Sequence, residues 1–353
     1  LEGGVGALVT SSGQAASLFA ILNLCQAGDH VVSTVAIYGG TFNLFAVTLR
    51  RFGIEFTFVD QNDAAEKIAA AFRPNTKAFF AETVTNPSLE IADLEKLAAI
   101  AHGQGVPFIV DNTFPTPILC RPIEWGADVV THSTTKYMDG HAQTVGGVVV
   151  DAGTFDWTSG KFPEFCEPDP SYHGISYAKR FGAAAFIVKA RVQLQRDIGA
   201  QQSPFAAYVV NLGLETLHLR MPRHCSNALA VARHLEKHPA IAWVNYPGLE
   251  SNPYHPLAQK YLPDGVGGVV SFGIRGVREA ATRFMDGLRL AAIVTHVADA
   301  RTCVLHPAST THRQLSDDQL RAAGISADLV RLSVGIEHVD DILADLDQAL
   351  AAL

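Results

Sequence analysis

The sequence has few cysteines, and they are not grouped. Its 353 residues include five, which are scattered and never spaced C-x-x-C. Scattered thiols of odd number are typical of a reducing compartment, and they argue against a disulfide framework or a zinc site. We therefore expect a cytoplasmic protein. A basic segment followed by an apolar one is also missing, so the sequence predicts no secretory signal.

Excess basic charge and long apolar runs are missing as well. The chain has 27 Lys and Arg against 35 Asp and Glu, which gives a formal net charge of −8. This mildly acidic balance disfavours a nucleic-acid binder, because such proteins usually present a basic face. No apolar stretch approaches the roughly 20 residues that cross a bilayer. We expect small-molecule partners, with neither nucleic acid nor a membrane among them.

The sequence does contain enough apolar material for a large core. Hydrophobic residues make up 48% of the chain, and its length suggests two domains. A helical stretch near residues 216–237 leads from one to the other, so we place a large domain at 1–218 and a small one at 219–353. In the small domain we expect strands at 268–273 and 303–306 and a final helix at 340–353.

The large domain alternates short apolar runs with segments of helical spacing. We expect strands at 30–36, 54–60, 77–82, 106–111 and 127–132, and helices at 15–25, 40–51, 63–72 and 91–104. This alternation predicts an α/β fold with a mainly parallel sheet between helices. Ligands bind beyond the carboxyl ends of the strands in such sheets. Residues 156–177, rich in proline, glycine and aromatics, are expected to form a long ordered loop.

A lysine flanked by hydroxyls follows the last of these strands, in Ser133-Thr134-Thr135-Lys136-Tyr137. The hydroxyls can hold a phosphate while the lysine amine reacts with a carbonyl, or Lys136 is simply a solvated lysine at a strand end. Asp111 ends another apolar strand, where a carboxylate is costly to bury without a partner. It either pairs with a protonated ring nitrogen of a cofactor or caps the following turn.

Polar residues also follow other strands. Gly13 and Gln14 stand at the start of an expected helix, whose free N–H groups suit a phosphate, although Ser12 is also an ordinary helix cap. Tyr38 can stack on a flat cofactor or be a plain loop residue. Asn86 can contact a ring oxygen or mark a turn. Together these residues predict a site for a planar, phosphorylated cofactor at the carboxyl edge of the sheet.

Motifs for other chemistries are incomplete. Gly3-Gly4-Val5-Gly6 lacks the third glycine of a dinucleotide-binding turn, and neither a phosphate-loop lysine nor a G-x-S-x-G segment is present. The segment from His306 to His312 does not have the spacing of metal ligands on a helix. The sequence therefore disfavours an NAD-dependent enzyme and predicts no metal.

Several segments together resemble the Cys/Met-metabolism PLP-dependent enzyme family. The matching motifs are SSGQAA, YGGT, ETVTNP, VDNTF, HSTTKYMDGH, HPASTTHRQLS and VRLSVGIEH. The resemblance covers the whole chain, and it is greatest to the O-acetylhomoserine sulfhydrylase branch. It implies an enzyme that uses pyridoxal 5'-phosphate (PLP) and has fold type I, similar to aspartate aminotransferase. The large domain would bind the cofactor.

The resemblance also implies roles for single residues. Lys136 matches the catalytic lysine that binds PLP as a Schiff base, Asp111 matches the partner of the ring nitrogen, and Tyr38 matches a catalytic residue that stacks on the ring. The remaining matches are to the phosphate site (Gly13, Gln14, Ser133, Thr135), the ring-hydroxyl contact (Asn86) and the substrate carboxylate site (Arg331, His296). His296 stands where the family usually has Ser or Asn.

The implied reaction is γ-replacement on O-acetyl-L-homoserine, in which sulfide or methanethiol displaces acetate and gives homocysteine or methionine. The alternatives are an O-succinylhomoserine sulfhydrylase, a methionine γ-lyase, a cystathionine γ-synthase or a non-catalytic binding protein of the same fold. The family also implies a homodimer or homotetramer with shared active sites. Its members carry an N-terminal arm, which we expect to be missing from this sequence. We expect the loop at 156–177 to shape entry of the thiol.

Overall fold

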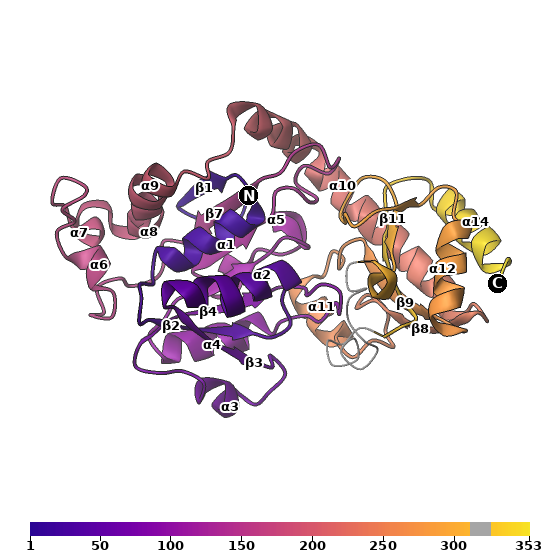
Figure 1. Cartoon of the computed structure of the whole chain (residues 1–353), viewed down its shortest axis with the longest axis horizontal. Helices are drawn as coiled ribbons and strands as arrows, with labels where there is room; N and C mark the ends of the chain where they lie inside the picture. Colours follow the sequence, from indigo (N-terminus) through magenta and orange to yellow (C-terminus); the bar gives the residue numbers. More distant parts are fainter. Residues whose placement is uncertain (311–325) are drawn as a thin grey trace. The chain divides into compact units, whose positions relative to one another are not determined.

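A computed structural model of the chain describes residues 1–310 and 326–353. The described residues form two compact units. Figure 1 colours the chain by residue number, so the segments of each unit can be followed in it. The first unit consists of residues 1–86, 92–135 and 143–212. The second consists of residues 87–91, 136–142 and 213–353. Two short internal segments therefore group with the C-terminal part of the chain.

The first unit contains a seven-stranded sheet. Its strands are β1 (Gly6–Thr10), β2 (His30–Thr34), β3 (Glu55–Val59), β4 (Thr76–Glu82), β5 (Phe108–Asp111), β6 (Val129–His132) and β7 (Gly147–Asp151). The order is β1-β7-β6-β5-β4-β2-β3, and only β7 runs antiparallel to its neighbours. The carboxyl ends of the other strands therefore meet at one edge. The expected α/β fold with a mainly parallel sheet is confirmed.

Helices flank this sheet. They are α1 (Gly13–Leu22), α2 (Gly39–Asn43), α3 (Ala65–Ala69), α4 (Leu94–Gly103), α5 (Thr116–Leu119), α6 (Pro163–Cys166), α7 (Tyr177–Phe181), α8 (Ala185–Lys189) and α9 (Arg196–Ile198). One core lies between the sheet and helices α1 and α8, where Phe19 and Phe186 pack with Phe80, Ile109 and Val129. Full burial of each such side chain contributes roughly 1.5–3 kcal/mol.

The loop at 156–177 is part of this core. The ring of Trp157 stacks on Phe165 and Phe186, with centroids 4.5 and 5.5 Å apart. Lys77, at the start of β4, donates to the carbonyl of Lys161 at 2.6 Å. The loop thus packs at the amino end of the strands, away from the edge where ligands of parallel sheets bind. This position does not support the expectation that the loop shapes thiol entry.

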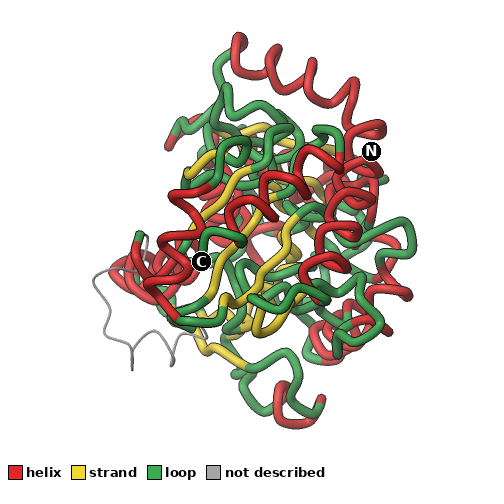
Figure 2. The backbone as a smooth tube through the Cα atoms, turned by 90° about the vertical axis from the view of Figure 1, so that its right-hand side faces the viewer, coloured by secondary structure: helices red, strands yellow, loops and turns green. Residues whose placement is uncertain are grey.

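The second unit contains a five-stranded sheet of order β10-β11-β12-β9-β8. Its strands are β8 (Ile241–Asn245), β9 (Val269–Ile274), β10 (Ala292–Ile293), β11 (Cys303–Leu305) and β12 (Leu329–Ser333). Its further helices are α11 (His255–Tyr261), α12 (Val277–Gly287) and α14 (Val339–Leu350), which are labelled in Figure 1. Figure 2 draws all helices in red and all strands in yellow. Helix α10 (Pro204–Glu236) begins well before the expected position. None of the helices described here is long and apolar enough to cross a membrane.

Candidate active site

The start of α1 lies against the segment that follows β6. The hydroxyl of Ser12 accepts from the N–H of Ala15 at 3.1 Å and caps the helix, as one of the two sequence interpretations held. A Cβ atom on Gly13 would lie 2.6 Å from Cβ of Ser133, so only glycine allows this approach. The first N–H groups of a helix have no partner within it and favour an anion. Gly13, Gln14 and Ser133 therefore form one corner whose chemistry suits an anion.

A chain of hydrogen bonds joins the ends of β5 and β6. The hydroxyl of Thr113 donates to Oδ1 of Asp111 at 2.5 Å and accepts from the N–H of Ser133 at 2.8 Å. The N–H of Thr113 donates to the same carboxyl oxygen at 3.0 Å, so Asp111 does cap the turn that follows it. This capping holds the carboxyl in place at the edge of the sheet. Sequence reasoning missed Thr113, although its place two residues after Asp111 is typical of such a turn.

A second buried acid, Glu82, lies beside Asp111. The two residues end β4 and β5 and are paired in register, so their side chains share one face of the sheet. Oε1 of Glu82 accepts from the N–H of Tyr38 at 2.6 Å, and the carboxyl also accepts from the backbone of Asn86. Burial, and then the charge of Asp111, raises the pKa of Glu82 well above its usual range. Burial also raises the pKa of Asp111.

Sequence reasoning also missed Glu82. It ends an apolar strand in the same way as Asp111, and that signal was available in the run from Lys77 to Glu82. The costs of burying the two carboxyls are of the same kind, because burial disfavours the charged form of each.

The ring of Tyr38 stands at the same edge, after β2. Half of the side chain is exposed, and the ring lies close to Gly40. The hydroxyl of Thr41 donates to Oε1 of Gln14 at 3.1 Å, which ties the start of α2 to the start of α1. Thr135 exchanges hydrogen bonds with Gly146, since its hydroxyl accepts from the N–H at 3.1 Å. These contacts fix the segments that carry the predicted cofactor residues of the first unit.

Lys136 directly follows Thr135 and belongs to the second unit. Burial, and then the positive charge of Arg331, lowers the pKa of the Lys136 amine to about 8. A lysine with a depressed pKa is a better nucleophile and base near neutral pH, because more of it is uncharged.

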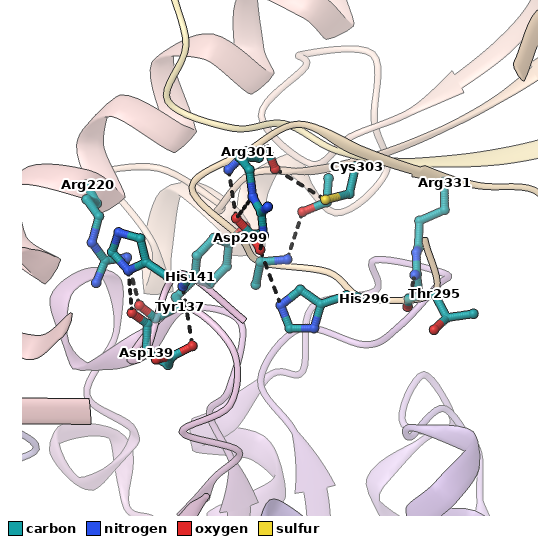
Figure 3. Close-up of polar contacts among 12 residues, drawn as sticks. Tyr137, Asp139, His141, Arg220, Thr295, His296, Asp299, Arg301, Cys303 and Arg331 are labelled. Carbon is teal, nitrogen blue, oxygen red and sulfur yellow. Dashed lines mark hydrogen bonds and ion pairs between the residues drawn. The ribbon is translucent and has the colours of Figure 1, made fainter. Parts of the chain in front are cut away.

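Arg331 and His296 lie in the same unit as Lys136. Arg331, on β12, donates to the carbonyl of Thr295 at 3.0 Å, as Figure 3 shows. Nε2 of His296 is 4.0 Å from Oδ2 of Asp299, and burial and then Lys136 lower the pKa of the imidazole. The carboxylate of Asp299 is itself bound by Arg301 at 2.9 Å. The second unit thus gathers the lysine, the arginine and the histidine that the sequence singled out.

The described residues contain no group of three His, Cys, Asp or Glu side chains that could hold a metal ion. His306, at the start of the segment weighed as a metal site, instead contacts Ser309 and the carbonyl of Ala327. His312 lies outside the described residues.

Comparisons with known proteins cover the whole chain. Residues 1–351 match the model of the family described as Cys/Met metabolism PLP-dependent enzyme. The chain is 50% identical over 353 residues to the homocysteine synthase of Schizosaccharomyces pombe, and covers 82% of that protein. It is also 50% identical over 352 residues to an O-acetyl-L-homoserine sulfhydrylase of Thermus thermophilus, of which it covers 84%.

A solved structure is similar over 99% of the chain. It is that of a putative O-acetylhomoserine (thiol)-lyase from Campylobacter jejuni, with 39% identity, a TM-score of 0.94 and 83% of that chain covered. That protein contains N'-pyridoxyl-lysine-5'-monophosphate. The fold and these matches agree, and the chain belongs to the Cys/Met metabolism PLP-dependent enzyme family.

Proposed function

We propose that this chain is a PLP-dependent transferase of methionine biosynthesis that replaces the acetate of O-acetyl-L-homoserine with sulfide or methanethiol. Relatives about 50% identical over the full chain are named homocysteine synthase and O-acetyl-L-homoserine sulfhydrylase. The observation that carries the proposal is Lys136, a lysine of lowered pKa three positions after Ser133, which lies against the start of α1. The products are homocysteine or methionine, and acetate.

The residues of the first unit fit PLP. A Cβ on Gly13 would collide with Ser133, so glycine lets the start of α1, whose free N–H groups suit an anion, lie against the segment after β6. Asp111 is a buried carboxyl of raised pKa, and a protonated ring nitrogen would offset the cost of its charge. We assign the phosphate to Gly13, Gln14, Ser133 and Thr135, the ring face to Tyr38, the ring hydroxyl to Asn86 and the covalent bond to Lys136.

PLP supplies an electron sink next to the substrate Cα. Asp111 keeps the ring nitrogen protonated, which maintains that sink. Lys136, with a pKa near 8, takes the proton from Cα and returns one at a neighbouring carbon. Tyr38 covers the ring and assists departure of the acetate from Cγ. Two of these roles are supported by contacts: Thr113 holds the carboxyl of Asp111, and Glu82 accepts from the N–H of Tyr38.

Arg331 binds the α-carboxylate of the substrate, for which the planar guanidinium offers two parallel donors. Its attachment to the carbonyl of Thr295 orients the side chain. His296, the next residue along the chain, contributes to the same carboxylate site. An imidazole there, in place of the smaller residue usual in the family, influences which ester is accepted.

A visible absorption spectrum of the purified protein with PLP tests the assignment of Lys136. The wild type should show the band of lysine-bound cofactor, and Lys136→Ala should lose it together with at least ~10³-fold of the activity. Lys67→Ala is the control, because Lys67 is exposed and forms an ion pair with Asp63. A Lys136→Ala variant that keeps the band would overturn the assignment.

The products distinguish the candidate reactions. A sulfhydrylase releases acetate only when sulfide or a thiol is added, whereas a γ-lyase forms a keto acid from the amino acid alone. Offering the O-acetyl and O-succinyl esters in parallel identifies the acyl group, and cysteine as the thiol tests for cystathionine synthesis. A protein that binds PLP but turns over none of these substrates would be the non-catalytic alternative. We also propose a cytoplasmic location and a homodimer or homotetramer.

A further inference from the structure

We propose that Glu82 is a positioning residue that fixes the two ring-contacting segments at Tyr38 and Asn86, and that it does so as a neutral carboxylic acid. The proposal rests on the proposed function, because it takes those two residues to contact PLP. It concerns a side chain for which the sequence analysis assigned no role.

One carboxyl group ties two loops together. Glu82 is buried at the end of β4, with 5% of its surface exposed. Its Oε1 accepts from the N–H of Tyr38, 44 positions earlier in the chain, at 2.6 Å. The same carboxyl accepts from the backbone of Asn86, in the loop that leaves β4. The segment with the stacking ring and the segment with the ring-hydroxyl contact are therefore held by a single side chain.

The partner of Glu82 across the sheet decides its charge. Asp111 lies directly opposite in register, and two buried carboxylates side by side cannot both ionise cheaply. Asp111 receives two hydrogen bonds from Thr113 and the favourable charge of His132, all of which stabilise its ionised form. His132 is in turn paired with Glu2.

The causes of the Glu82 shift are different. Burial and the charge of Asp111 both raise its pKa, and the backbone hydrogen bonds from Tyr38 and Asn86 lower it, with no cation among these effects of the described residues. The proton of the pair therefore stays on Glu82, and Asp111 carries the charge. A ring nitrogen at this edge then faces one carboxylate and not two, which sets how firmly that nitrogen holds its proton.

Three substitutions separate position from charge. Glu82→Gln keeps the shape, the hydrogen-bond acceptor and the neutral state, so PLP affinity should stay within about twofold of the wild type and the pH midpoint of the cofactor band should not move. Glu82→Ala removes the acceptor for both loops, so PLP should bind at least tenfold more weakly. Glu82→Asp is too short to reach both loops, so the visible circular dichroism of the bound cofactor should change. Glu66→Gln, at an exposed site on α3, is the control.

Each result supports or overturns the proposal. If Glu82→Gln moves the pH midpoint of the band by a full unit or more, Glu82 is ionised and the charge assignment is wrong. If neither Glu82→Ala nor Glu82→Asp alters PLP affinity or circular dichroism, the positioning role is wrong. Should Glu82→Ala not fold, the Gln and Asp variants still decide both points. A wild type without any cofactor band would instead overturn the proposed function itself.

Discussion

Burial of the Asp111 carboxyl both lowers the stability of the fold and suits the residue to bind a positive charge. Its pKa is raised by burial, so the folded carboxyl holds a proton more tightly than the unfolded one. Such a group destabilises the fold as the pH rises above the unfolded pKa, and the penalty is complete once the pH exceeds the raised value. At neutral pH the Asp111 carboxylate therefore costs stability, and the protonated ring nitrogen of a bound cofactor would offset that cost.

We predict that Asp111→Asn has opposite effects on folding and on cofactor binding. Without PLP, its thermal midpoint should exceed that of the wild type at pH 8, and the difference should shrink toward pH 4. With PLP, its affinity should fall at least tenfold, because a neutral amide does not stabilise a protonated ring nitrogen. Thermal unfolding at both pH values and a PLP titration measure this. A variant that unfolds at the wild-type temperature at every pH would contradict it.

Arg331 gives a prediction about the substrate. Arg331→Lys keeps the charge but loses the fork of two donors, so KM for the homoserine ester should rise by about 10- to 100-fold. KM for sulfide should stay within twofold, because sulfide has no carboxylate. Arg275→Lys, in which an arginine that donates to the carbonyl of Pro239 is changed, is the matched control. An equal rise in both KM values would remove Arg331 from the carboxylate site.

The sequence predicted single residues where a local signal existed. Asp111 ends an apolar strand and Lys136 comes shortly after another, and the cofactor roles of both stay predictions. Glu82 carried the same signal but was passed over, since its use depends on the backbone N–H of Tyr38, which no local pattern reveals. The lowered pKa of Lys136 likewise depends on burial and on Arg331, which is 195 positions away in the chain (331 minus 136).

At the scale of elements, parallel strands were easier to predict than antiparallel ones. The expected strand 77–82 corresponds to β4, and the expected 127–132 to β6. Strand β7 was missed; it lies between β1 and β6 in the sheet and runs antiparallel to both. The expected helix at 40–51 is a short α2 followed by π- and 3₁₀-helical turns. Its apolar spacing predicts a helix, but the spacing does not determine whether each turn has the α, π or 3₁₀ hydrogen-bond pattern.

The loop at 156–177 gives a prediction of stability without a change in activity. Trp157 is almost completely buried between Phe165 and Phe186, so Trp157→Ala should cost about 3–5 kcal/mol of unfolding free energy. KM for sulfide should not change at temperatures where the variant is folded. Phe52→Ala is the control, because that ring is mostly exposed and its loss should cost less than about 0.5 kcal/mol. A selective rise in KM for sulfide would return the loop to a role in thiol entry.

At the scale of the whole molecule, the domain boundary placed at residue 218 stays a prediction, and the sequence carried no signal for the two short internal segments that group with the second unit. Residues 87–91 belong to the second unit because Asn245 and Ser271 donate to the carbonyls of Ser88 and Pro87. Residues 136–142 belong there because Arg220 donates to the carbonyl of Tyr137 at 2.8 Å. Both depend on contacts between residues more than 80 positions apart.

The first turns of α10 support the proposed oligomer. Phe205, Tyr208 and Leu212 are spaced for one helical face, and all three are exposed, Phe205 by 76%. Exposed apolar stripes of this kind mark interfaces between subunits. We predict that Phe205→Glu lowers the solution mass measured by light scattering, whereas Phe52→Glu, at another exposed ring, leaves it unchanged. Equal masses for both variants would exclude this stripe as an interface.

The buried acids at the sheet edge have a consequence for the life of the protein in a cell. Newly made chains carry the cost of Glu82 and Asp111 until they capture their ligand, and a ligand that binds only the folded form stabilises it by mass action. Proteases remove the fraction that opens, and a change of 1–2 kcal/mol is enough to alter abundance several-fold. We expect the cellular amount of this enzyme to follow the supply of vitamin B6, because the cofactor stabilises the folded form against proteolysis.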